Sequence, residues 1–412
     1  MGQKPQSIQK VYLTLTLLST LAASFIWGVN TLFLLDAGLS NLEAFAANAF
    51  FTAGQVIFEV PTGIVADTFG RRISYMLGTL TLGASTILYF LAWQVHAPFW
   101  GWALISVLLG LGFTFFSGAT EAWLVDALKF TNFKGNLESV FANGQKVMGI
   151  AMLAGSVGGG LVAQASNLGV PYILRALLLG ITFIIAFLFM KDLGFTPKRS
   201  KRVLRDMKNI FTTSLNIGMR RPAIRWVMLE APFSVGLSFY AFYAMQPHLL
   251  NLYGDPNAYG VAGLAAAIVA GAQIAGGFAV PYLKRIFKSR ISALATIISI
   301  NSLVILSIGI TNSFPIAVGL LVIWGLLFAS RMPIRQAYLN DLIPSKQRAT
   351  VLSFDSLMGS SGGVVIQPTL GKIADVYSYS ASYMGGAVFQ IMALPFILLA
   401  RREKPKSDKI IK

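Results

Sequence analysis

The chain of 412 residues could form two or three soluble domains, but 55% of its residues are apolar and only 12% are charged, which excludes an ordinary soluble protein. Its 39 glycines and 16 prolines show no period and it has no cysteine, which excludes collagen, disordered and disulfide-stapled chains. The two histidines, His96 and His248, are far apart in the sequence, so we expect no metal site, no cofactor and no enzymatic activity.

Apolar segments long enough to cross a membrane follow one another along the chain. A hydrocarbon core of about 30 Å takes about 20 residues of helix. This length predicts an all-α membrane protein with twelve transmembrane helices in two pseudo-symmetric six-helix bundles. The predicted spans are 11–35, 43–66, 73–94, 99–126, 138–165, 171–190, 224–250, 259–283, 291–311, 315–341, 349–376 and 381–400.

A polar stretch between the sixth and seventh spans divides the chain. Apolar residues at helical spacing in 203–217 predict a helix on the inner membrane surface, with a plain linker as the alternative. Phe58-Glu-Val-Pro61 and Phe278-Ala-Val-Pro281 take matching places in the two halves, which indicates an internal repeat. The predicted domains are an N-terminal bundle, a basic cytoplasmic linker, a C-terminal bundle and a basic tail, at 1–190, 191–223, 224–400 and 401–412.

The basic residues predict the orientation in the membrane. The chain has 33 Lys and Arg and a net charge of +17, and most of the basic residues fall in the head, the central linker, the tail and alternate loops. The positive-inside rule predicts that the chain lies in the cell membrane with both termini on the cytoplasmic side. The charge therefore predicts contact with anionic lipid headgroups and not with nucleic acid. The basic residues inside predicted spans are Lys146, Arg175, Arg331, Arg335 and Lys372.

A motif follows the second predicted span. The chain reads Gly63-Ile-Val-Ala-Asp67-Thr-Phe-Gly70-Arg71-Arg72, where a tight turn between helices would explain both glycines and paired charges at helix ends would explain Asp67 and the arginines. The motif resembles the signature G-x-x-x-D-(R/K)-x-G-(R/K)-(R/K) of the major facilitator superfamily, with Thr68 in place of the first basic residue. The resemblance covers essentially residues 11 to 400.

In that family this turn acts as a conformational latch whose arginine pairs with an acid at the inner end of the fourth helix. The resemblance therefore implies a cluster of Asp67, Arg72 and Asp126. The alternative is that these are ordinary interfacial charges that serve topology. The expected latch residues are Gly63, Asp67, Gly70, Arg71, Arg72 and Asp126. The fifth span carries Gly155-Ser-Val-Gly-Gly159-Gly160, where many drug antiporters of the family have proline at the second position.

Charges inside the predicted spans must face protein or a watery cavity, because a charge in hydrocarbon costs at least about 2.5–3.5 kcal/mol. Arg331 is predicted near the midplane, where an ion pair with Glu121 is one alternative. Arg175 and Lys372 are predicted near the outer ends, with their charged groups reaching the interface. The acids within the spans are Glu59, Glu121, Glu230 and Asp355, of which all but Glu59 are predicted near the inner surface together with Lys146.

In the resembled fold, the first, fourth, seventh and tenth helices line a central cavity. Carried onto this chain, this implies an aromatic pocket with a few charges, which suits amphipathic organic molecules. The alternative is that the aromatic side chains only pack. The implied substrate-binding residues are Trp27, Asn30, Phe116, Glu121, Tyr240, Tyr243, Gln246, Trp324, Arg331 and Arg335.

Two carboxylates are the predicted proton carriers. Shielding from water favours the neutral acid, which makes Glu59 and Glu121 the candidates. The alternative for Glu59 is that it takes up a backbone group freed by Pro61.

These observations predict a monomeric secondary transporter that works by alternating access. The leading form exports small amphipathic, drug-like compounds, its substrates, in exchange for protons. One alternative imports, or lets pass, an organic anion bound by Arg331 and Arg335. Another is a membrane sensor that does not transport. No phosphate-binding string such as G-x-x-x-x-G-K-(S/T) occurs in the sequence, so ATP is not the expected energy source.

Overall fold

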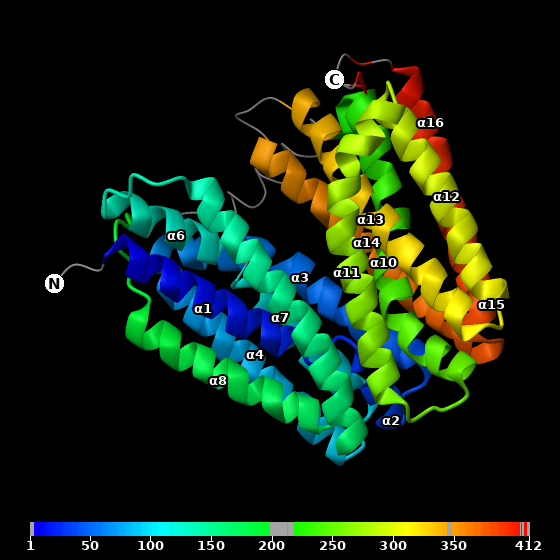
Figure 1. The fold of residues 1–412 in the computed structure, drawn as a ribbon, viewed down its shortest axis with the longest axis horizontal. Helices are drawn as coiled ribbons and strands as arrows, with labels where there is room; N and C mark the ends of the chain where they lie inside the picture. The colour runs from blue at the N-terminus through cyan, green and yellow to red at the C-terminus, as the bar shows by residue number, and fades with distance from the viewer. Residues whose placement is uncertain are drawn as a thin grey trace. The chain divides into compact units, whose positions relative to one another are not determined.

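The computed structural model describes residues 4–116, 118–197, 212, 218–343, 348–403, 405 and 408–409 (Figure 1). These residues are overwhelmingly helical, and the pairing of β type found among them is an isolated bridge between Ser289 and Lys409. The predicted surface helix at 203–217 lies outside the described residues except for Thr212, so it stays a prediction.

The chain forms two compact units that do not follow chain order alone. Residues 39–49, which begin a helix of the first half, belong to the second unit, and residues 257–267 of the second half belong to the first unit. The first unit is Met1–Gly38, Phe50–Val203 and Asn257–Ala267, and the second is Leu39–Ala49, Leu204–Pro256 and Ile268–Lys412.

The first unit is a set of packed helices in which α1 lies along α7 and α8, and α4 lies along α5 and α8 (Figure 1). Two of its predicted spans are interrupted, since α1 and α2 are separated by residues 25–29, and α5 ends five residues before α6 begins. Its helices are α1 (Pro5–Ser24), α2 (Asn30–Asp36), most of α3 (Asn41–Phe69), α4 (Arg71–Gln94), α5 (Phe99–Thr114), α6 (Ala119–Phe130), α7 (Leu137–Ala165) and α8 (Val170–Phe189).

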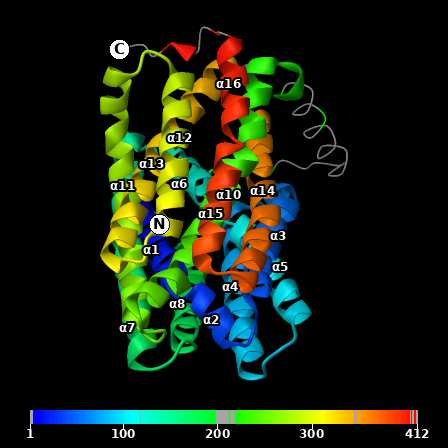
Figure 2. The ribbon, with the colours of Figure 1, turned by 90° about the vertical axis from the view of Figure 1, so that its right-hand side faces the viewer.

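The second unit repeats this pattern of packing (Figure 2). Here α10 lies along α14, and α12 lies along α13 and α15, as α1 lies along α7 and α4 along α5 and α8. The same order of partners agrees with the predicted internal repeat. Its helices are α10 (Pro222–Tyr253), most of α11 (Tyr259–Ile286), α12 (Arg290–Ile310), α13 (Phe314–Leu342), α14 (Arg348–Val376), α15 (Tyr379–Ile391) and α16 (Leu394–Arg402).

Glycines allow the closest of these helix contacts. A Cβ atom on Gly159 of α7 would lie 1.8 Å from the carbonyl oxygen of Phe25, and one on Gly362 of α14 would lie 1.9 Å from that of Pro232 in α10. Membrane helices pack through small residues because lipid gives them no hydrophobic driving force to associate. The glycine-rich segment predicted in the fifth span is therefore a packing surface against the first span.

Ten helical segments in the described ranges are long and apolar enough to cross a membrane, counting 99–130 and 379–402 each as one. The segments at the predicted first and eleventh places, α1 with α2 and α14, are helical but are not among these ten. Polar residues dilute both: α1 begins Pro-Gln-Ser-Ile-Gln-Lys, and α14 is rich in serine and glycine.

Candidate functional site

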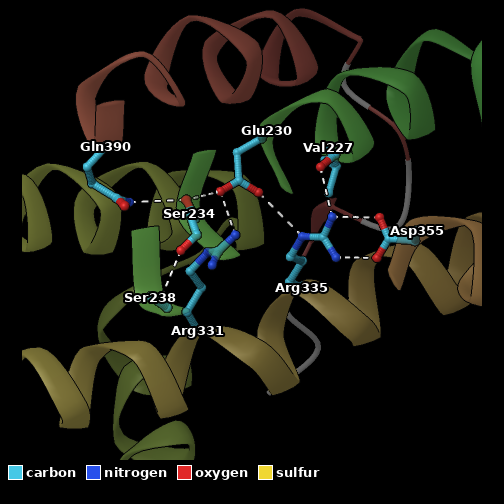
Figure 3. A network of polar contacts seen from close by, with 8 residues as sticks. All are labelled: Val227, Glu230, Ser234, Ser238, Arg331, Arg335, Asp355 and Gln390. Atoms are coloured by element: carbon cyan, nitrogen blue, oxygen red, sulfur yellow. Dashed lines mark hydrogen bonds and ion pairs between the residues drawn. The ribbon is translucent and has the colours of Figure 1, made fainter. Parts of the chain in front are cut away.

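Four ionisable side chains are buried together in the second unit (Figure 3). Glu230 of α10 is 0% exposed, Arg331 and Arg335 of α13 are 3% and 4% exposed, and Asp355 of α14 is 7% exposed. The two arginines are four residues apart, so they share one face of α13 and both reach Glu230. We call these four residues the charge network.

Each charge of the network meets an opposite charge. The Nη2 atom of Arg331 donates to Oε1 of Glu230 at 2.5 Å, and Nε of Arg335 donates to Oε2 at 3.4 Å. Arg335 also grips Asp355 with both Nη atoms, of which Nη2 lies 2.7 Å from Oδ1. Two cations and two anions therefore cancel, which meets the condition under which charges can be buried at all.

Neutral polar groups extend the network toward α15 (Figure 3). The Ser234 hydroxyl donates to Glu230, and Nε2 of Gln390 donates to the Ser234 hydroxyl at 3.1 Å. A cavity of about 10 Å³ lies beside them, and three side chains that line it, Asn301, Arg331 and Gln390, each carry a buried polar atom without a protein partner. The room and the polar lining suit a single water-sized polar molecule.

The structure changes two expectations about charges. The carboxylate that pairs with Arg331 is Glu230 and not Glu121. The side chain of Glu121 is exposed and that of Glu59 is half-buried, whereas Glu230 is completely shielded. Sequence reasoning placed Glu230 inside a span but did not select it. The available signal was the balance of two acids and two arginines within the seventh, tenth and eleventh predicted spans.

A second cavity, of about 220 Å³, lies in the first unit. The two helix interruptions supply part of its wall, because Trp27 lies between α1 and α2 and Phe116 lies between α5 and α6. The structure thus brings together two of the predicted substrate-binding residues. The residues that line it are Ser19, Thr20, Ala23, Trp27, Leu82, Phe113, Phe116, Met148, Arg175 and Leu179.

Arg175 contradicts the expectation that its charged group reaches the membrane interface. Its side chain is 3% exposed, lines the cavity of the first unit, and donates from Nε to the Thr86 hydroxyl at 3.1 Å. The sequence placed it near the outer end of a span, but depth alone does not show whether a side chain turns toward lipid or toward other helices.

The other predicted substrate-binding residues are mostly buried among side chains. The Tyr240 hydroxyl donates to that of Ser382 at 2.5 Å, and the side-chain oxygen of Asn30 accepts from the Tyr172 hydroxyl at 3.0 Å. Trp324 stacks on Phe328 with ring centroids 6.1 Å apart. Tyr243 is half-buried and Gln246 is fully buried. Their roles in binding substrate stay predictions.

The predicted latch has a different set of contacts in the described chain. Asp67 pairs with Arg71 at 2.7 Å, while the Arg72 backbone N–H donates to Oδ1 of Asp192 at 2.9 Å and its side chain donates to the Phe187 carbonyl at 2.6 Å. Among the described ion pairs none joins Arg72 to Asp126, so the expected three-residue cluster is not formed.

The turn before α4 explains one of the two motif glycines. Gly70 has a φ of 110°, and a Cβ atom there would lie 2.3 Å from Oδ2 of Asp192. Gly63 instead lies inside α3 with no atom within 4 Å of its Cβ position, so the turn does not explain it. Burial raises the pKa of Asp192 above its usual range, although the hydrogen bond and charge of Arg72 oppose this shift.

Known proteins resemble the whole chain. The profile of the Major Facilitator Superfamily matches residues 12–330 and 233–412. The chain is 22% identical over 408 residues to the uncharacterized MFS-type transporter YxaM of Bacillus subtilis, covering 97% of this chain and 96% of that one. It is also 20% identical over 212 residues to an uncharacterized MFS-type transporter of Methanocaldococcus jannaschii. This match covers 52% of this chain and 53% of that relative, so it spans about half of each.

Solved transporters share the fold at low sequence identity. The nucleoside transporter NupG aligns with a TM-score of 0.79 at 12% identity, covering 97% of this chain and 100% of that one. A D-xylose-proton symporter aligns with a TM-score of 0.67 at 15% identity, covering 98% of this chain and 99% of that one. At such identities the likeness establishes the fold and leaves the substrate open.

Proposed function

Because this chain belongs to the major facilitator superfamily of multi-pass membrane transporters, we propose that it is a secondary transporter that exports small amphipathic organic compounds in exchange for protons. Twelve crossings in two six-helix repeats, with both termini cytoplasmic in the cell membrane, complete the proposal, and the chain acts as a monomer. The basic linker and tail support this orientation.

The observation that carries the proton coupling is the completely buried carboxylate of Glu230 between two arginines. Arg331 and Arg335 favour the ionised carboxylate in this arrangement, so Glu230 can take up a proton only when its ion pairs with them open, and the network then gains one net positive charge. Such a change favours a different arrangement of α10 and α13, which is how a bound proton can bias one conformation over another. Glu230 is thus a stronger candidate for coupling than Glu59 or Glu121.

The cavity of the first unit supports the proposed class of substrate. Its wall is mainly apolar and aromatic, and it contains one charged side chain among the described lining residues, Arg175. An amphipathic molecule has a body that such a wall can bury and a polar group that needs one partner.

Flux measurements in proteoliposomes test this proposal. A pH gradient should drive saturable movement of an amphipathic probe, and Glu230→Gln should abolish the dependence on the gradient while the probe still binds. Glu59→Gln and Glu121→Gln are the companion variants: unchanged proton-driven flux in both removes these residues from the coupling path. An inward current carried by an organic anion would instead favour the importer, and no saturable flux of any compound would favour the sensor.

A further inference from the structure

The hydroxyl of Ser234 donates to the buried carboxylate of Glu230 (Figure 3), and the same side chain lines the cavity of about 10 Å³ in the second unit. We propose that this cavity binds one water molecule and that Ser234 relays a proton from this water to Glu230. The inference rests on the proposed proton coupling at Glu230 and names the route that the proton takes.

The polar atoms around the cavity match the hydrogen bonds of a water molecule. Nε of Arg331 can only donate, whereas Oδ1 of Asn301 and Oε1 of Gln390 can only accept, and the described residues offer none of the three a partner. All three side chains line the cavity and are 7% exposed or less. A water molecule can accept from the arginine and donate to both amides. A sodium ion would leave the arginine N–H without an acceptor, and a chloride ion would leave both amide oxygens without a donor.

Ser234 is the neighbour of Glu230, among those described, that can pass a proton on. The other two, Arg331 and Arg335, cannot, because a guanidinium does not give up its proton in proteins. A serine hydroxyl has one hydrogen to donate and two sites that accept. The Ser234 hydroxyl donates to Glu230 and accepts from Nε2 of Gln390 at 3.1 Å, and no other described residue bonds it. One acceptor site is thus left for the cavity water.

The transfer moves one positive charge and restores both carriers. The cavity water takes up a proton from the aqueous phase and becomes a hydronium ion, which gives one hydrogen to Oγ of Ser234. The hydrogen that Ser234 already carries moves to Oε1 of Glu230 in the same step. Water and serine are then as they were before, and Glu230 is a neutral acid.

The relay stays beside Glu230 when the ion pairs open. Ser234 follows Glu230 by four residues on α10, so the two side chains share one face of one helix. The arginines lie on α13 and can separate from Glu230 without breaking its contact with Ser234. α15 contributes the neutral Gln390 through Ser234, and the charged residues of α16 lie at its exposed end. The described charged groups that contact Glu230 directly or through one shared partner are Arg331 and Arg335 of α13 and Asp355 of α14.

Proton uptake by the purified full-length protein after a rapid drop in pH tests the relay. A soluble pH indicator should show one proton taken up by the wild type and not by Glu230→Gln. Ser234→Ala should slow this uptake at least about tenfold without changing its final extent, whereas Ser234→Thr keeps a hydroxyl and should stay close to the wild-type rate. Ser302→Ala is the matched control, because this similarly buried hydroxyl donates to the Ile298 carbonyl outside the charge network. A wild-type rate in Ser234→Ala, or an equal loss in Ser302→Ala, would overturn the relay.

Mixtures of light and heavy water give a readout that a merely structural serine would not change. Because two hydrogens move together, the uptake rate of the wild type should vary with the deuterium fraction along a curve, and that of Ser234→Ala along a straight line. Gln390→Met removes the amide that orients the Ser234 hydroxyl, so it should slow uptake less than Ser234→Ala and keep the curve. A straight line in the wild type would contradict the transfer through serine.

Brief X-ray radiolysis tests the water, since hydroxyl radicals formed from a bound water oxidise the side chains that contact it. Ile298 lines the cavity, whereas Ile305 on the same helix, α12, does not, and both are 0% exposed. Mass spectrometry should therefore find Ile298 oxidised well above Ile305. Equal protection of the two isoleucines would show a dry cavity and remove the water site.

The route and the proposed transport function can fail separately. If a pH gradient drives flux at equal rates in the wild type and Ser234→Ala, the transport function stands and the relay is wrong. If the purified protein gives the expected uptake rates while no gradient drives flux of any compound, the transport function is wrong and the route to Glu230 stands.

Discussion

The two units bury their arginines in different surroundings. In the second unit Arg331 and Arg335 form ion pairs with Glu230 and Asp355, and the cavity beside them has a volume of about 10 Å³. In the first unit Arg175 contacts the hydroxyl of Thr86 and lines a cavity of about 220 Å³. The arginines of the second unit thus hold α10, α13 and α14 together through carboxylates, whereas Arg175 lies in the wall of a cavity large enough for a small organic molecule. The following experiments test the buried charges and other contacts within each unit.

The largest effect is expected from breaking the charge network. Glu230→Gln leaves Arg331 without its carboxylate in a buried site, which should lower the free energy of unfolding by about 3–5 kcal/mol. The double variant Glu230→Gln with Arg331→Gln restores charge balance and should recover part of this loss. Denaturant unfolding in detergent measures both. Strictly additive effects of the two substitutions would show that the pair is not energetically coupled.

Next in size is the effect of filling the glycine contacts. Gly159→Ala and Gly362→Ala place a methyl group against a backbone oxygen, so each should cost about 1–3 kcal/mol of stability. If the repeat packing is equivalent, the two losses should be similar. Gly180→Ala and Gly319→Ala are helical controls with nothing within 4 Å of the Cβ position, and they should be neutral or slightly stabilising. Thermal unfolding of all four variants checks this, and a loss in the controls as large as in the packed positions would contradict it.

A smaller effect is expected where a distant carboxylate caps a helix. In the second unit, Asp375 accepts hydrogen bonds from the backbone N–H groups of Asn41 and Leu42, both at 2.8 Å, at the start of α3. Asp375→Asn keeps one acceptor and loses the charge at the positive end of the helix, so it should cost about 1 kcal/mol. Hydrogen exchange of the first turn of α3 should rise in the variant, and unchanged exchange would remove the capping role.

The smallest effect is a pH dependence at Asp192, which lies outside the spans. Because burial raises its pKa in the folded protein, the folded state holds this proton more tightly than the unfolded chain. The stabilisation it contributes is therefore fully present below the ordinary Asp pKa and is lost as pH rises through the raised value. The Tm of the wild type minus that of Asp192→Asn should therefore fall as the pH rises through this acidic window. If this difference instead grew with pH, folding would lower the pKa of Asp192 and not raise it.

The sequence contains most of the information about where the helices lie along the chain. Apolar length predicted the helical segments, and the motif from Gly63 to Arg72 led to the correct family. The interruption at residues 25–29 was not predicted, because apolar composition continues through it. The twelve crossings and their orientation stay predictions, since ten segments meet the criteria for a span.

The candidate site was less predictable because depth does not fix the direction in which a side chain points. Arg331 was correctly expected to face protein, but its partner lies 101 residues earlier in the chain, on another helix. Arg175 was placed correctly along its helix and wrongly toward the interface. At a given depth a side chain can point in any direction around the helix axis. The helices that pack around it, and so determine whether it faces lipid or protein, come from remote parts of the sequence.

The exchange of residues 39–49 and 257–267 between the units has a mechanical consequence. Both α3 and α11 are continuous helices, and each begins in one unit and continues in the other. No flexible loop is present at either crossing point to absorb a displacement. A rearrangement that kept residues 39–49 with the second unit and residues 257–267 with the first would have to bend or twist intact hydrogen-bonded helix near Phe50 and Ala267.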